Sequence, residues 1–120
     1  MKILVVEDEA LMLKTLEMKL QKEGYEIVSC ADGQTALELM EKENPLMVIT
    51  DIMLPFSSGI EIIRAAKQRA HPIAVIVLSA LGQESTVEEA FQMGADDYIT
   101  KPFNLNELTI RIKRLLKKIE

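Results

Sequence analysis

Five residues of this 120-residue chain carry groups that could together handle a phosphoryl group: Glu7, Asp8, Asp51, Ser79 and Lys101. Three carboxylates packed together repel, and their pKa values rise unless a cation compensates. Carboxylate oxygens are the ligands that Mg²⁺ prefers, and two or three suffice because the ion keeps several waters. With Mg²⁺, the ammonium and the hydroxyl present, the site could stabilise a phosphoryl group in transfer. Asp51, central among the five, is the best placed nucleophile and would form an acyl-phosphate.

Each of these residues lies at, or just after, the end of a short apolar run that predicts a β-strand. The expected strands cover residues 3–6, 25–30, 46–50, 73–78 and 98–100. Between them, apolar residues at helical spacing predict helices that include residues 13–20, 36–40, 60–66, 87–91 and 105–119. Gly24 and Gly94 stand where the first and fourth helices should end.

Strands that alternate with helices predict an α/β fold with a parallel sheet between two helix layers. Five such units without a dinucleotide-binding glycine motif suit a flavodoxin-like sheet of order 2-1-3-4-5, in which ligands bind at the carboxyl ends of the strands. In that order strands one, three and four are neighbours and strand five follows four. The five residues should therefore converge on one edge of the sheet.

Each residue also has an ordinary structural explanation when it is taken alone. Asp8 could cap the first helix, and Asp51 could be a turn residue. Ser79 could be a satisfied hydroxyl at a strand end, and Lys101 a solvated loop lysine. Their joint placement at neighbouring strand ends favours a shared metal and phosphoryl site.

Composition excludes several classes of protein. The net charge is −5, and the first 110 residues hold 9 basic and 18 acidic residues, which argues against direct nucleic acid binding. The basic last ten residues suit either a helix C-terminus or a partner-docking face. Residues 73–81 form the longest apolar stretch, which is too short to span a membrane. A single cysteine, a single histidine and an acidic start without a signal peptide fit one reduced, cytoplasmic domain over residues 1–120.

Four motifs in order make the whole chain resemble the receiver domain of two-component response regulators. They are MKILVVEDEA, ITDIMLPFSSGIE, VIVLSA and GADDYITKPF. The resemblance implies that Asp51 accepts a phosphoryl group from a sensor histidine kinase or a phosphotransfer protein. It also implies a Mg²⁺ site in which Asp51 and Asp8 bind directly, Glu7 binds through water and the carbonyl of Met53 completes the protein ligands.

The resemblance assigns roles to the later motifs as well. Ser79 would hydrogen-bond a phosphoryl oxygen, Ala80 would leave room for the group, and Lys101 would pair with its charge. Tyr98 would be the aromatic switch that turns inward when Ser79 moves, and the peptide bond between Lys101 and Pro102 would be cis.

The implied function is a phosphorylation-dependent switch, not an enzyme in the usual sense, that assists its own phosphoryl transfer and hydrolysis. Phosphorylation would change the surface around the fourth helix and fifth strand and so regulate an output partner or domain. The DNA-binding branch of the family usually carries a basic residue near Val87 and Glu near Gln92, and this chain lacks both charges. Asp96, Asp97 and Arg111 are kept, and a phosphorylation-dependent homodimer stays open.

Two other functions fit the sequence less well. A haloacid-dehalogenase-type phosphatase needs a second Asp two residues after its nucleophile, where this chain has Met53. A phosphorylation-independent interaction module usually loses an acid or the lysine, and this chain has lost neither. Cys30 and Phe91 are expected to be buried apolar residues.

Overall fold

The computed structural model describes residues 1–119, in which five strands alternate with five helices. The strands are β1 (Lys2–Val6), β2 (Glu26–Cys30), β3 (Met47–Thr50), β4 (Ala74–Ser79) and β5 (Asp97–Thr100). The helices are α1 (Ala10–Lys22), α2 (Gly33–Glu43), α3 (Gly59–Lys67), α4 (Glu84–Gln92) and α5 (Leu105–Ile119). The predicted order of elements is therefore confirmed.

The strands form one parallel sheet of order β2-β1-β3-β4-β5, the flavodoxin-like order predicted from the sequence. The register aligns Val6 of β1 with Thr50 of β3, and Ser79 of β4 with Thr100 of β5. Because all strands run the same way, the residues that follow them meet at a single edge of the sheet.

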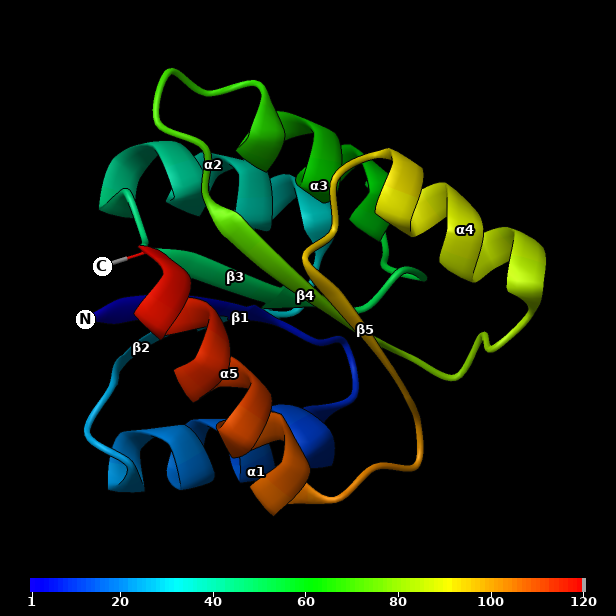
Figure 1. Ribbon diagram of the computed structural model, residues 1–120. Coiled ribbons are helices and arrows are strands. Elements are labelled where there is room, and N and C mark those ends of the chain that lie inside the picture. The colour runs from blue at the N-terminus through cyan, green and yellow to red at the C-terminus, as the bar shows by residue number, and fades with distance from the viewer. Residues whose placement is uncertain (120) are drawn as a thin grey trace.

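Two hydrophobic clusters, one on each face, hold the sheet between its helices (Figure 1). Buried side chains of α1 and α5 pack on one face, and those of α2, α3 and α4 pack on the other. The central strands β1, β3 and β4 contribute to both clusters, which explains why their sequences lack a polar alternation. This double covering fixes the strand ends that carry the acidic residues.

Local signals set several helix ends. The Asp32 side chain caps α2 by accepting a 2.7 Å hydrogen bond from the amide of Thr35, and the Asn104 side chain accepts one of 2.7 Å from Asn106 in α5. Gly24 and Gly94 follow α1 and α4 with φ of 96° and 113°, a conformation that glycine adopts without steric cost. Both predicted helix stops are confirmed.

The structure decides one open alternative, extends one strand and corrects one expectation. Glu9, not Asp8, stands at the N-cap of α1, so capping does not explain Asp8. Ser79 is the last residue of β4, one residue beyond the expected range, because its backbone pairs with β5. Its side chain is fully buried. Phe91, expected in the core, is 45% exposed.

Cys30 is partly buried, and burial raises the pKa of its thiol to about 11. This makes the thiol unreactive at neutral pH, in keeping with an apolar structural role. Within residues 1–119, the helices are too short or too polar to cross a membrane.

Candidate functional site

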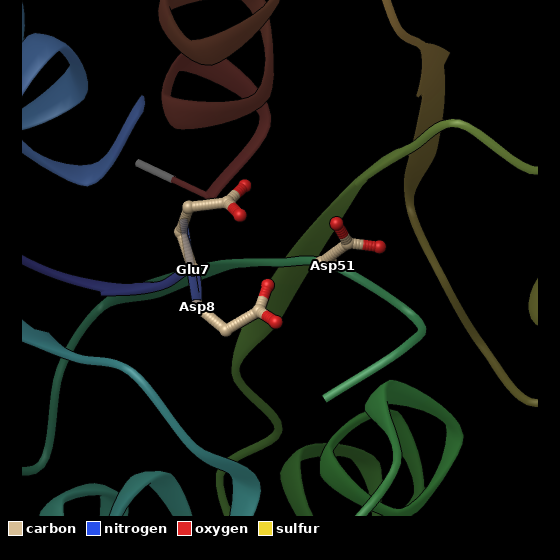
Figure 2. Close-up of side chains that lie close together, drawn as sticks. All are labelled: Glu7, Asp8 and Asp51. Carbon is tan, nitrogen blue, oxygen red and sulfur yellow. The ribbon is translucent and has the colours of Figure 1, made fainter. Parts of the chain in front are cut away.

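Three carboxylates gather at the carboxyl edge of the sheet. Glu7 and Asp8 follow β1, Asp51 follows β3, and each offers one oxygen that lies within 4.8 Å of the others. Figure 2 shows the three side chains extending from these two strand ends into the same region. Glu7 is buried, Asp51 is half-buried and Asp8 is exposed, so the cluster opens to solvent on the side of Asp8. Clustered carboxylates with one open side are suited to a hard divalent cation.

Lys101 supplies the positive charge within this cluster. Its ammonium lies 2.6 Å from Oε1 of Glu7 and 2.9 Å from Oδ2 of Asp51. Burial alone would lower the pKa of Lys101, but its hydrogen bonds with Glu7 and Asp51 outweigh that effect and raise the pKa above its ordinary value. The lysine is thus a charged bridge between the ends of β1 and β3, not the solvated loop residue that it could have been.

Backbone groups hold the acids in place. Oδ1 of Asp51 accepts hydrogen bonds from the amides of Ile52, at 2.6 Å, and Met53, at 3.3 Å. Oε2 of Glu7 accepts one of 3.1 Å from the amide of Glu9, while its other oxygen faces Lys101. Both oxygens of Glu7 are therefore engaged by protein donors, which suits a carboxylate that acts on a metal indirectly.

Gly59 permits a close approach beneath Asp51. A Cβ atom at this position would lie 2.1 Å from the backbone oxygen of Asp51, and the amide of Gly59 donates to the carbonyl of Ile52 at 2.8 Å. Any side chain at this position would push α3 away from the backbone of Asp51 and Ile52. Sequence reasoning did not single out Gly59, and its place at the start of a helix was the available signal.

Ser79 and Tyr98 are joined through the backbone of Leu81. The amide of Leu81 donates to Oγ of Ser79 at 3.0 Å, and the Tyr98 hydroxyl donates to the carbonyl of Leu81. The amide of Lys101 donates to the carbonyl of Ser79 at 2.8 Å, and the peptide bond between Lys101 and Pro102 is cis, as the family resemblance implied. Tyr98 is 9% exposed and lies in the inward orientation.

Met53 lies two residues after Asp51 in the sequence. It is 65% exposed and lines, with Asp8 and the loop that leads to α3, an open hollow of about 430 Å³. Ala80, after β4, is exposed, so its small side chain leaves the edge near Ser79 open. The edge is therefore accessible from outside at both Asp8 and Ala80.

Asp96, Asp97 and Arg111 form ion pairs within this chain. Arg111 lies 2.8 Å from Asp97 and 2.8 Å from Glu107, and Lys67 lies 2.6 Å from Asp96. The Arg111–Asp97 pair connects α5 to β5, and the Arg111–Glu107 pair lies within α5. The Lys67–Asp96 pair connects α3 to the residue directly before β5. These ion pairs give Asp96, Asp97 and Arg111 a structural role in the single chain.

Comparisons with known proteins agree with this arrangement. The family described as "Response regulator receiver domain" matches residues 3–113. The chain is 36% identical to "Alkaline phosphatase synthesis transcriptional regulatory protein PhoP" of Bacillus subtilis, with 99% of this chain and 50% of that protein covered. It is 41% identical to "Response regulator RR06" of Streptococcus pneumoniae, with 98% and 54% covered. The chain thus spans about half the length of these curated relatives.

Solved structures give the same result. The Francisella response regulator 1452 receiver domain superposes with a TM-score of 0.92 at 32% identity, covering 99% of this chain and 98% of that one. The BeF3-activated DrrB receiver domain superposes with a TM-score of 0.88 at 40% identity, with 97% of each chain covered.

Proposed function

Because the chain belongs to the response regulator receiver family, we propose that it is a switch whose state is set by phosphorylation of Asp51. The observation that carries the proposal is the position of Asp51, with Glu7, Asp8 and Lys101 around it. A sensor histidine kinase or a phosphotransfer protein is the phosphodonor. Residues 1–120 act as one receiver domain in the cytoplasm, and an output partner or domain reads the switch.

The phosphoryl transfer starts with attack of a carboxylate oxygen of Asp51 on the phosphorus of a phosphohistidine. The phosphorus–nitrogen bond breaks, its electron pair returns to the imidazole ring, and an acyl-phosphate forms. Asp8, Asp51 and the carbonyl of Met53 would hold Mg²⁺, with Glu7 acting through water, and the bound ion would supply positive charge at the transferred group. Two amide donors already orient the side chain of Asp51 for this attack.

Lys101 and Ser79 stabilise the phosphorylated state. The ammonium of Lys101, 2.9 Å from Asp51, pairs with the phosphoryl charge, and the buried hydroxyl of Ser79 donates to a phosphoryl oxygen. When Ser79 moves toward the phosphoryl group, Tyr98 moves with it, because both side chains are hydrogen-bonded to the backbone of Leu81. The surface formed by α4 and β5 therefore changes when Asp51 is phosphorylated. Water later hydrolyses the acyl-phosphate and resets the switch.

Labelling with acetyl phosphate tests this function without a partner protein. In the presence of Mg²⁺ the chain should gain one phosphoryl group, measured as intact mass, and Asp51→Asn should gain none because an amide is a poor nucleophile. Asp32→Asn is the matched control, since it removes a carboxylate outside the site, and should label like wild type. Stable labelling of Asp51→Asn at another residue would overturn the proposal, and so would labelling of wild type that is unchanged when Mg²⁺ is removed.

A further inference from the structure

Phe91 lies on α4 with nearly half of its side chain in water. It is 45% exposed, whereas its neighbour Ala90 is fully buried. An exposed phenylalanine contributes less to folding than a buried one, because less apolar surface leaves water. Its placement therefore calls for a reason other than core packing.

The nearest aromatic partner of Phe91 is Tyr98. The two ring centroids are 6.5 Å apart and the ring planes are tilted by 43°, within the range of attractive aromatic pairs. Figure 1 shows α4 lying along the side of the sheet where β5 runs, so the pair joins the helix to the edge strand. Tyr98 itself is buried, with its hydroxyl bound to the carbonyl of Leu81.

This contact places Phe91 at the end of a continuous chain of contacts from the strand edge. Ser79 accepts the amide of Leu81 at 3.0 Å, the carbonyl of Leu81 accepts the hydroxyl of Tyr98, and the Tyr98 ring meets Phe91. A group that stabilises one orientation of Tyr98 shifts the population between inward and outward orientations by its differential contact energy. Phe91 makes such a contact with the inward orientation.

We propose that Phe91 is a positioning residue that holds Tyr98 inward, against the carbonyl of Leu81. This inference rests on the role assigned to Tyr98 in the proposed function, and extends it to a residue on the helix surface. Loss of the aromatic contact should lower the ratio of inward to outward Tyr98 about 2- to 10-fold. Because binding and conformation are reciprocally linked, the contact also sets how easily the phosphorylated state is reached.

The test must separate positioning from simple covering of the Tyr98 ring. Covering would change solvent access to the ring but leave the Leu81 hydrogen bond intact. The readout is therefore the ¹³C resonance of the Leu81 carbonyl, measured in the whole chain without phosphodonor. Tyr98→Phe, which keeps the ring and removes the hydroxyl, gives the resonance position for the broken bond.

Phe91→Ala should move the Leu81 carbonyl resonance from its wild-type position toward that of Tyr98→Phe. Phe91→Tyr, which keeps an aromatic ring, and Glu88→Ala, an exposed substitution on the same helix, should leave it in place. An unchanged resonance in Phe91→Ala, or an equal displacement in Phe91→Tyr, would overturn the proposal. Acetyl phosphate labelling of Asp51 is measured separately, so a failure of the proposed function is distinguishable from a failure of this inference.

Discussion

At the scale of single residues, Phe56 has the least favourable backbone conformation beside the site. Its φ is 69°, and the amide of Ser57 donates to the carbonyl of Pro55 at 2.8 Å across it, which makes a tight three-residue turn. Such turns are rare and strained for a residue with a bulky side chain. The amide of Gly33 also donates to the carbonyl of Pro55, at 3.0 Å, so α2 helps to hold the strained loop.

Replacement of Phe56 by Asn should stabilise the fold. Asn tolerates the left-handed conformation better than Phe, and the Phe56 side chain is 85% exposed, so few contacts are lost. The free energy of unfolding should rise by about 1 kcal/mol, measured by urea denaturation with an unchanged slope. Leu11→Asn, at a helical position that is 74% exposed, is the control and should give no gain. A less stable Phe56→Asn would contradict the strain argument.

The lifetime of the phosphorylated state should depend on two apolar residues. Hydrolysis needs a water in line with the phosphorus–Asp51 bond, and Met53 and Leu81 are expected to flank that approach. Neither side chain can orient a water molecule. An amide or carboxylate at such a position would do so and raise the hydrolysis rate about 10–100-fold, below the usual range of general-base catalysis. We therefore expect slow autodephosphorylation, and faster phosphate loss in Met53→Asn with little change in Mg²⁺ affinity.

The measurement is the rate constant of phosphate loss after removal of acetyl phosphate. Met18→Asn, which changes a methionine of α1 that is 61% exposed, is the control and should match wild type. Equal rate constants for wild type and Met53→Asn would mean that the flanking side chains do not position the water.

The positions of the three carboxylates could be predicted from the sequence, but their side-chain contacts could not. The sequence places Glu7, Asp8 and Asp51 together because they follow buried strands. The carboxyl ends of parallel strands lie at the same edge of a sheet. The bridge from Lys101 to Glu7 and the exposure of Phe91 depend on side-chain orientation across elements. No periodicity in the chain encodes such orientation, so both were missed.

At the scale of elements, the ends of helices and of strands were both predictable, and four of the five strands end at the expected residue. Gly24 and Gly94 mark helix ends because their backbone conformation is costly for other residues. β4 extends one residue beyond the apolar run, to Ser79, because Ser79 pairs with Thr100 of the neighbouring strand.

The cap of α2 leads to a pH-dependent prediction. The amide and hydroxyl of Thr35 donate to Asp32 and lower the pKa of that carboxyl from its ordinary value of 3.8. Because the folded pKa is the lower one, the stabilisation is fully present above the unfolded value and is lost as the pH falls through the folded value. Asp32→Ala should lower the unfolding temperature at pH 7, and the difference from wild type should narrow below about pH 4.

Asp32→Asn separates the cap from the charge. Asn accepts the same amide hydrogen bond but carries no charge and does not titrate. Its unfolding temperature at pH 7 should therefore lie between those of Asp32→Ala and wild type. If the difference in unfolding temperature between wild type and Asp32→Ala stayed constant from pH 7 to pH 2, the ionised form of Asp32 would contribute nothing to the cap.

At the scale of the whole molecule, folding brings together charges that the unfolded chain keeps apart. The chain has a net charge of −5, and its sheet edge concentrates three carboxylates around a single ammonium. Lys101 offsets part of the repulsion through Glu7 and Asp51, but Asp8 is not among its partners in the described residues. The edge is thus a place where the folded chain gains from an added cation and the unfolded chain does not.

Mg²⁺ should therefore stabilise the whole fold by mass action. A ligand that binds the folded chain alone adds about 2.7 kcal/mol to the free energy of unfolding at 100 times its dissociation constant. The unfolding temperature should rise with Mg²⁺ at fixed ionic strength. The rise should shrink in Asp8→Asn, since this variant removes the proposed direct ligand while Lys101 still pairs with Glu7 and Asp51. Asp32→Asn, which removes a carboxylate away from the edge, should keep the full rise. If Asp8→Asn and wild type responded equally to Mg²⁺, the ion would be acting on the general negative charge of the molecule and not at this edge.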